Sequence, residues 1–190
     1  MSDTIEIRWH GRGGQGTKTA ALLLADVVAS TGRYVQGFPE YGPERMGAPI
    51  TAYNRVSDSR IRVHSNIYTP KYVVVVDETL LQTIDVAKGL DKEGAIIVNT
   101  AKAKEEVRKH LNGYTGRIHT IDARQISEKA LGQYFPNVPM LAAIIKIAKL
   151  MDKEKFIKEM KISFEHKFVS KPEVVAGNMK SLELSLQEVQ

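Results

Sequence analysis

The chain has no cysteine among its 190 residues. This absence excludes disulfides, thiolate chemistry and iron–sulfur clusters with the usual all-cysteine ligands from this polypeptide. The five histidines are scattered along the sequence without the spacing of a ligand pair, so no zinc site is predicted. If the protein takes part in redox chemistry, we expect the metal clusters to lie on a partner.

Long apolar runs and a signal peptide are also missing. No segment has the uninterrupted apolar length that crosses a bilayer, and the first four residues lack the basic and apolar regions of a signal peptide. We therefore expect a cytoplasmic protein without membrane contact. The composition, 43% apolar and 26% charged, is typical of a soluble globular protein, and the length predicts a single domain over residues 1–190.

The net charge of +5 favours an acidic ligand, an acidic partner subunit or nucleic acid. Much of the excess lies in the lysines of residues 146–171, which interleave with apolar residues at the spacing of amphipathic helices. No DNA- or RNA-binding motif accompanies these lysines, so we expect no nucleic-acid partner.

A glycine-rich stretch follows the first predicted strand. The alternating residues 5–9 predict a strand, and the apolar residues 20–29 predict a buried helix. Four glycines lie between these elements: Gly11, Gly13, Gly14 and Gly16. The first amides of a helix have no intrahelical acceptor and carry the positive end of its dipole, so a strand, a glycine turn and a helix predict an anion site. Arg12 and Lys18 add positive charge beside these amides.

The same stretch fits parts of two nucleotide-binding patterns. Residues 11–16 match G-x-G-x-x-G, but the next predicted strand, 34–38, carries no acidic residue to bind an adenosine ribose, and Glu40 follows only in a loop. Residues 17–18 are Thr-Lys, the reverse of the order that a P-loop requires. A stand-alone NAD-binding Rossmann protein and a tight turn that binds nothing remain as alternatives.

Strands alternate with helices along most of the chain. The predicted strands after the first are residues 34–38, 50–56, 60–64, 72–76, 95–99 and 117–121. The predicted later helices are residues 77–88, 104–111, 122–132, 140–148, 152–166 and 170–190. This order predicts a three-layer α/β/α fold with a mostly parallel, mixed, Rossmann-like sheet, which binds ligands at the carboxyl ends of its strands. The glycine loop, residues 39–49 and Asp77 are expected to converge there.

Several local predictions follow from turn and cap residues. Residues 50–56 and 60–64 are predicted to pair as a hairpin, and residues 39–49, with three prolines and no periodicity, form a long loop of the kind that carries function. Residues 135–139 are expected to separate two helices. The predicted N-caps are Asp77, Asp122, Asp152 and Ser170.

The chain resembles a known family at two loops together. Residues 10–16 and 36–49 resemble the γ subunit of 2-oxoacid:ferredoxin oxidoreductases, and residues 73–78 and 136–140 also match the pattern of that family. Relatives from other branches often carry Arg-Gly-Gly where this chain has Met-Gly-Ala at residues 46–48. The resemblance is therefore nearest to the pyruvate branch, and the 2-oxoisovalerate, 2-oxoglutarate and indolepyruvate branches remain alternatives.

The resemblance implies one subunit of a heterotetramer that is inactive alone. Such a complex decarboxylates a 2-oxoacid oxidatively with thiamine diphosphate, passes electrons through iron–sulfur clusters to ferredoxin, and forms acyl-coenzyme A. This chain lacks a Gly-Asp-Gly diphosphate motif and cysteine. Thiamine diphosphate, magnesium and the clusters are therefore expected on the partner α, β and δ subunits only.

The resemblance and the glycine loop together imply a coenzyme A site. We expect the loop amides and nearby cations to hold the coenzyme A phosphates, and the resemblance adds an asparagine as a polar contact. These residues are Arg12, Gly13, Gly14, Gln15, Gly16, Lys18 and Asn137. Tyr41, Glu44 and Arg45 are expected at the subunit interface or near the ligand. No residue is predicted as a catalytic group or a metal ligand.

Overall fold

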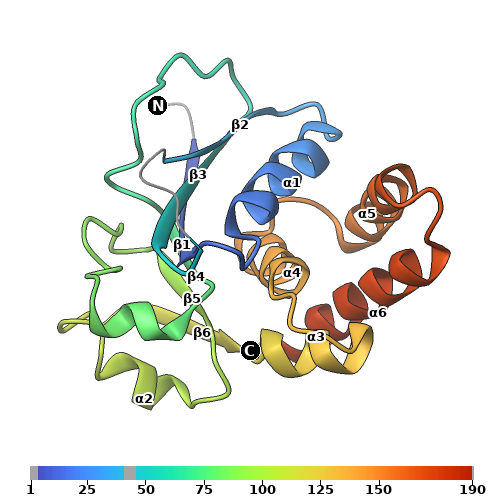
Figure 1. Cartoon of the computed structure of the whole chain (residues 1–190). Coiled ribbons are helices and arrows are strands. Elements are labelled where there is room, and N and C mark those ends of the chain that lie inside the picture. Colours follow the sequence, from blue (N-terminus) through green and yellow to red (C-terminus); the bar gives the residue numbers. More distant parts are fainter. Residues whose placement is uncertain (1–3, 41–45, 190) are drawn as a thin grey trace.

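The computed structural model describes residues 4–40 and 46–189, which build a six-stranded sheet in the order β2-β3-β1-β4-β5-β6 (Figure 1). The strands are β1 (Ile5–Arg12), β2 (Tyr34–Pro39), β3 (Pro49–Ser57), β4 (Tyr72–Val75), β5 (Ala95–Asn99) and β6 (Arg117–Ile121). β1, β4, β5 and β6 are parallel, whereas β3 runs antiparallel to both β1 and β2. The predicted mixed, mostly parallel sheet is thus confirmed.

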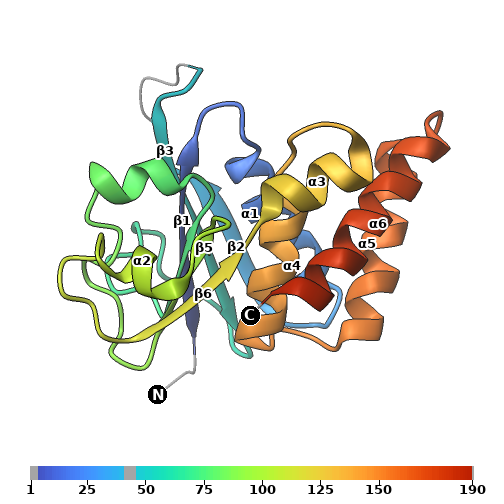
Figure 2. The same cartoon turned by 90° about the horizontal axis from the view of Figure 1, so that it is seen from below.

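Helices cover both faces of the sheet, but unequally (Figure 2). On one side, α1 (Thr17–Ala29) and α4 (Asn137–Ala148) pack on the sheet, and α3 (Ala123–Leu131), α5 (Lys153–Lys167) and α6 (Pro172–Glu188) pack against them and each other. The other side has η1 (Glu78–Gln82) and α2 (Lys104–Arg108). β4 and β5 are buried along their whole length, as expected for parallel strands with both faces covered.

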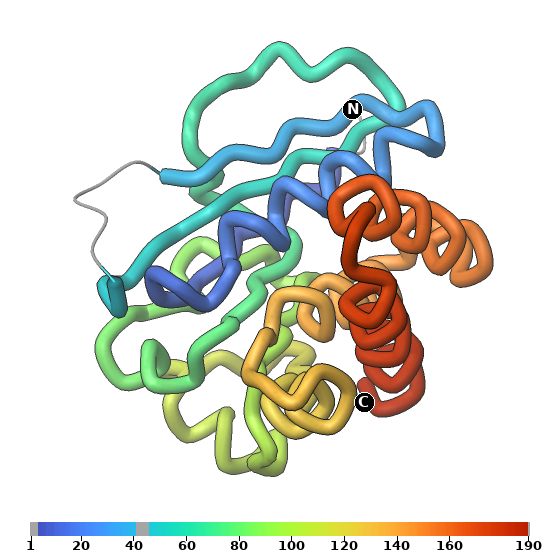
Figure 3. The backbone as a smooth tube through the Cα atoms, turned by 45° about the vertical axis from the view of Figure 1, so that its right-hand side comes forward, coloured from blue at the N-terminus to red at the C-terminus, as the bar shows by residue number. Residues whose placement is uncertain are grey.

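The strand period of two divides the apolar residues between two cores. Val74 and Val76 pack with Trp9 on the side of α1 and α4, whereas Val73 and Val75 pack on the side of α2. Trp9 also donates its indole N–H to Asn54 Oδ1 at 2.8 Å, and Asn54 Nδ2 donates to the carbonyl of Ala21 at 2.8 Å. These bonds join β1, β3 and α1, which runs along the β2–β3 pair (Figure 3).

The predicted hairpin of residues 50–56 with 60–64 is wrong. β3 pairs with β2 on one side and with β1 on the other, so it has no free edge for a further strand. Residues 58–71 contain no helix or strand. Arg55 from β3 instead holds this segment, because its guanidinium donates to the carbonyls of Ser65 at 2.7 Å and Asn66 at 3.4 Å.

Two of the four predicted N-caps are confirmed. Asp77 accepts a hydrogen bond from the amide of Thr79, and Asp122 accepts one from that of Gln125. Asp152 precedes α5 but makes no side-chain cap bond. The Ser170 prediction is wrong, because α6 follows Lys171 and takes its fixed φ from a proline at its first position.

Several helices differ in extent from the prediction: α1 begins at Thr17 rather than residue 20, and α2 ends at Arg108 rather than residue 111. The helix expected over residues 77–88 is a single 3₁₀ segment, η1, over Glu78–Gln82. α4 begins at Asn137, because Pro139 lies in its first turn, where a missing N–H breaks no helical bond. A break between two helices is present as expected, but it covers residues 132–136 rather than 135–139. Among the described residues, no helix combines the length and the apolarity needed to cross a bilayer.

Candidate functional site

The glycine loop joins the carboxyl end of β1 to the N-terminus of α1. The first helical hydrogen bond of α1 runs from the amide of Ala20 to the carbonyl of Gly16 at 2.8 Å, so the amides of residues 17–19 precede it. Gly14 has φ +94° and Gly16 has φ +74°. Both angles lie in the left-handed region, which explains why glycine stands at these two positions.

Two of the four backbone amides of residues 13–16 donate hydrogen bonds to carbonyls within the chain. The amide of Gly13 donates to the carbonyl of Ala48 at 2.9 Å, and its carbonyl accepts from the amide of Gly47 at 3.1 Å. The amide of Gln15 donates to the carbonyl of Arg12 at 3.2 Å. A ligand at this loop therefore depends on the amides of Gly14 and Gly16 and on the first turn of α1.

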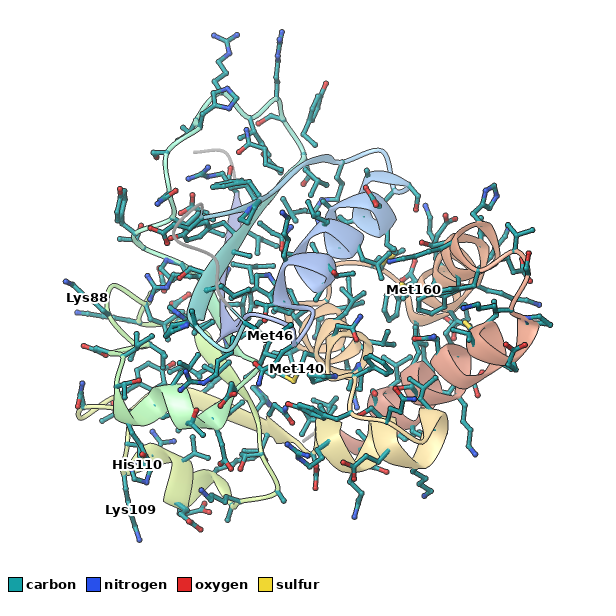
Figure 4. The ribbon with its side chains drawn as sticks, in the orientation of Figure 1. Met46, Lys88, Lys109, His110, Met140 and Met160 are labelled. Atoms are coloured by element: carbon teal, nitrogen blue, oxygen red, sulfur yellow. The ribbon has the colours of Figure 1, made fainter. Side chains whose placement is uncertain are left out.

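A cavity of about 400 Å³ opens at these amides. Its lining joins the loop, the start of α1 and the start of β3: Gly13, Gly14, Gly16, Thr17, Lys18, Thr19, Met46 and Ile50. Figure 4 shows Met46 beside the loop, and a Cβ built on Gly14 would lie 2.5 Å from its sulfur. Lys18 is exposed on the wall of this cavity.

Asn137 lies against the loop from the start of α4. A Cβ built on Gly16 would lie 3.0 Å from the Cβ of Asn137 and 3.3 Å from its Cγ. The fold thus brings together the glycine loop and the asparagine that the resemblance selected. Gly16 is required here both for its φ and for this close approach.

Arg12 and Gln15 brace the loop from the side of η1. The guanidinium of Arg12 donates to Thr79 Oγ1 at 2.9 Å, and its Nε lies 3.4 Å from Asp77 Oδ2. Gln15 Oε1 accepts from the amide of Arg12 at 2.9 Å, while Gln15 Nε2 donates to Asp77 Oδ2 at 2.5 Å. Both side chains were expected to contact a ligand, and the structure directs both toward Asp77.

Asp77 is the centre of this brace, whereas the sequence predicts for it only a helix cap and a position near the glycine loop. Burial alone would raise its pKa, but hydrogen bonds from Thr79 and Gln15, with the charge of Arg12, outweigh burial and hold the pKa below its usual value. Asp77 is therefore ionised at neutral pH. Asp77 lies two positions after the end of the buried strand β4, at the carboxyl edge of the sheet, and this place indicates its nearness to the loop but not its partners.

A buried Arg8–His10 pair lies on β1 just before the loop. Arg8 Nη2 donates to the carbonyls of Val86 at 3.0 Å and Lys88 at 2.7 Å, and its Nε donates to His10 Nε2 at 3.1 Å. Burial and the charge of Arg8 lower the pKa of His10 to about 4. His10 is therefore neutral at pH 7 and serves as a hydrogen-bond acceptor beneath the site.

The three residues predicted at the subunit interface or near the ligand are not among the described ones. Tyr41, Glu44 and Arg45 lie outside the described residues. In the part of the chain that the structure describes, no group of three or more His, Asp or Glu side chains is arranged to hold a metal ion.

The sheet order separates this site from a dinucleotide site. In a dinucleotide-binding unit the strand after the first helix lies beside the first strand, and its acidic residue reaches the ribose. Here β3 lies between β1 and β2. The strand that follows α1 is therefore one position too far from the loop for that role.

Comparison with known proteins identifies the family. The family model "Pyruvate ferredoxin/flavodoxin oxidoreductase" matches residues 6–188. Pyruvate synthase subunit PorC of Thermotoga maritima is 43% identical over 185 residues, 97% of this chain and 94% of the relative. The pyruvate/ketoisovalerate oxidoreductases common subunit gamma of Thermococcus kodakarensis is 46% identical over 160 residues, 84% of this chain and 86% of the relative.

A solved structure agrees with these relatives. The crystal structure of pyruvate oxidoreductase subunit PORC from Thermotoga maritima superposes with a TM-score of 0.85 at 38% identity, over 98% of this chain and 97% of that one. The α/β fold with a mixed sheet is thus shared with this subunit. The chain belongs to the pyruvate ferredoxin/flavodoxin oxidoreductase family and is a subunit of a 2-oxoacid:ferredoxin oxidoreductase.

Proposed function

We propose that the chain is the γ subunit of a pyruvate:ferredoxin oxidoreductase and that its glycine loop binds the phosphates of coenzyme A. The observation that carries this proposal is the N-terminus of α1, which opens on the 400 Å³ cavity between Gly14 and Gly16. Backbone amides at a helix N-terminus are donors that suit phosphate oxygens.

The residues around the loop fit an anionic ligand. Lys18 contributes a positive charge on the cavity wall, and Asn137 provides an amide beside Gly16. In this proposal Arg12 and Gln15 hold the shape of the loop through Asp77, and Arg12 adds charge at short range. The cavity suits the diphosphate portion of the ligand, and partner surfaces enclose the remainder.

The chain supplies binding rather than redox chemistry. Thiamine diphosphate, magnesium and iron–sulfur clusters belong to the proposed α, β and δ partners, where they would carry decarboxylation and electron transfer to ferredoxin. The residues of this chain orient the acyl acceptor, coenzyme A, toward that centre. A cytoplasmic heterotetramer, inactive when this chain is alone, completes the proposal.

Pyruvate is proposed as the 2-oxoacid because relatives along most of the chain are named pyruvate synthase subunits. Relatives from Thermococcus and Pyrococcus are named common subunits of pyruvate and ketoisovalerate oxidoreductases. Those names favour a partner subunit as the determinant of the 2-oxoacid. The 2-oxoisovalerate, 2-oxoglutarate and indolepyruvate branches are therefore the alternatives.

The first experiment is an anaerobic purification of the tagged chain from its native cells. We expect larger subunits that bear thiamine diphosphate and iron–sulfur clusters to co-purify, with reduction of a dye that depends on both pyruvate and coenzyme A. Other 2-oxoacids tested on the same sample identify the branch. A chain that purifies alone, without this activity, overturns the proposed function.

A second experiment tests the phosphate site in the assembled complex. Replacing Lys18→Ala is expected to raise the KM for coenzyme A about tenfold, because a charge-assisted contact contributes about 1.5 kcal/mol, and to leave the KM for pyruvate unchanged. Lys92→Ala, an exposed lysine remote from the loop, is the matched control. Equal KM values for coenzyme A in the two variants contradict the site.

A further inference from the structure

Met46 carries an exposed thioether at the mouth of the candidate site. Its side chain is 87% exposed and lines the cavity beside the glycine loop (Figure 4). Five of the six methionines lie within the described residues. Of these, Met140 and Met160 are fully buried, and Met151 and Met179 are half-buried. Among the described methionines, the sulfur of Met46 is therefore the one most open to reagents in solution.

Hydrogen bonds fix the chain next to Met46 against the loop. The amide of Gly47 donates to the carbonyl of Gly13 at 3.1 Å, and Arg12 Nη1 donates to the carbonyl of Gly47 at 3.1 Å. A Cβ built on Gly14 would lie 2.5 Å from Met46 Sδ. Since that Cβ would be about 1.5 Å from the Cα, the sulfur lies at most about 4 Å from the Cα of Gly14.

The sulfur is thus close to hydrogen-bond donors that have no acceptor. The amides of Gly14 and Gly16 make no hydrogen bond within the part of the chain that the structure describes. They lie at the positive end of the α1 dipole, which favours negative charge. An oxygen atom added to the sulfur of Met46 would lie beside the same donors that the phosphate of coenzyme A uses in the proposed function.

Oxidation by a hydroperoxide adds such an oxygen to a thioether. The sulfur attacks one oxygen of the O–O bond, a sulfur–oxygen bond forms, and the O–O bond breaks. The sulfur loses two electrons, and the hydroperoxide is reduced to an alcohol, or to water if it is hydrogen peroxide. The product, methionine sulfoxide, is polar, and methionine sulfoxide reductases return it to the thioether with a thiol reductant.

We propose that Met46 is a site of reversible oxidation by hydroperoxides, through which an oxidant regulates the binding of coenzyme A. This inference rests on the proposed coenzyme A site. The thioether leaves the amides of Gly14 and Gly16 to the phosphate. The sulfoxide oxygen accepts from these amides instead, and its partial negative charge repels the phosphate. Because coenzyme A has to reach this cavity, a smaller hydroperoxide reaches the sulfur on its wall too.

The first test maps oxidation in the intact complex. The anaerobically purified complex is exposed to limited hydrogen peroxide, and peptide mass spectrometry measures the oxygen gained at each methionine. Met46 is expected to be oxidised at least about tenfold faster than Met140 and Met160, because both of these are 0% exposed. Oxidation of Met46 that is no faster than theirs overturns the proposal, since the sulfur is then closed to the oxidant in the complex.

The second test links the oxidation to coenzyme A. In the oxidised wild type the KM for coenzyme A should rise about fivefold, while the KM for pyruvate stays unchanged. Methionine sulfoxide reductase with a dithiol should reverse the rise. Damage to clusters on partner subunits removes active complexes, so it lowers kcat rather than KM.

Met46→Leu, oxidised in parallel, accounts for every other group that peroxide attacks. The KM for coenzyme A of each complex is compared before and after oxidation. A rise of the same size in Met46→Leu overturns the proposal, and so does a wild type in which Met46 is oxidised and the KM for coenzyme A is unchanged.

The third test places an acceptor at the loop without an oxidant. Met46→Gln carries a side-chain carbonyl near the place of the sulfoxide oxygen, so its KM for coenzyme A should be about fivefold above that of Met46→Leu. Both variants should fold, because residue 46 is exposed. Met151→Gln makes the same change at a half-buried methionine away from the loop and is the matched control. Equal KM values in Met46→Gln and Met46→Leu contradict the proposed competition.

Failure of this proposal is distinct from failure of the proposed function. If Lys18→Ala raises the KM for coenzyme A but oxidation and Met46→Gln do not, the regulatory site alone is refuted. If none of these three changes alters the KM for coenzyme A, the coenzyme A site is refuted with it.

Discussion

Substitution of Gly16→Ala tests the contact on which the candidate site is built. The new Cβ would stand at φ +74° and would meet the Cβ of Asn137 at 3.0 Å. The Cβ of Asn137 cannot rotate away, because the backbone of α4 fixes it. The chain therefore has to accommodate both a left-handed alanine and a separation of α1 from α4 by a few tenths of an ångström.

The expected loss of stability can be worked from these two terms. The left-handed conformation costs about 1–2 kcal/mol, and the reduced entropy of the unfolded chain offsets about 0.5–1 kcal/mol of it. The overpacking against Asn137 adds about 1–2 kcal/mol. A net loss of about 2 kcal/mol should lower the Tm of a chain of this size by about 4–8 °C.

Gly132→Ala is the matched control, because it isolates the backbone term. Gly132 has φ +69°, and a Cβ built there meets nothing within 4 Å. Its replacement should therefore cost about 0.5–1 kcal/mol, which is the left-handed strain less the entropy offset, with no overpacking. Urea or thermal unfolding of the full chain measures both variants.

A double-mutant cycle completes the experiment. Gly16→Ala combined with Asn137→Gly removes the opposing Cβ, so the coupling free energy between the two positions should be about 1 kcal/mol. If Gly16→Ala and Gly132→Ala lower stability equally, and the cycle shows no coupling, then the close approach of Asn137 does not constrain the loop and the reasoning is refuted.

Two further predictions concern the groups beneath the loop. The pKa of His10 is about 4 in the folded chain and 6.5 in the unfolded chain, so on acidification the unfolded chain takes up the imidazole proton first. The free energy of unfolding should therefore be at its full value above pH 6.5 and fall by about 2 kcal/mol between pH 7 and pH 5. Urea unfolding should show this decrease in the wild type and not in His10→Gln. An equal decrease in the variant would assign the pH dependence to other groups. Asp77→Ala removes the cap of η1 and the acceptor of Gln15, so it should lower the free energy of unfolding by about 1–2 kcal/mol and raise the KM for coenzyme A. Asp77→Asn keeps the cap acceptor, so it should restore most of the stability but leave the KM raised. If Asp77→Asn restores both the stability and the KM, the brace has no role in the site.

Most of the sheet could be predicted from sequence because its signals are local. β4 and β5 are β-branched runs buried on both faces, and α1 is an apolar run preceded by glycines. The glycine loop could be predicted for the same reason, since its left-handed positions require glycine. These features depend on short segments of chain and on backbone conformation.

The errors arose where distant partners decide the structure. Residues 60–64 alternate like a strand, but β2 and β1 already occupy both edges of β3, and Arg55 holds the segment by its carbonyls. No periodicity reveals which edges are occupied. The brace around Asp77 was missed because its members come from two segments far apart in the sequence, residues 12–15 and 77–79, and only the fold brings them together.

The reciprocal hydrogen bonds between Gly13 and residues 47–48 extend the antiparallel ladder of β1 and β3 into the loop. On the other edge of β3, the amide of Glu40 donates to the carbonyl of Thr51 at 2.9 Å and extends the pairing of β2 with β3. Backbone hydrogen bonds thus hold both ends of the connection from β2 to β3, at Glu40 and at residues 47–48. We therefore expect insertions or deletions between Glu40 and Gly47 to change how far this connection extends without shifting the glycine loop.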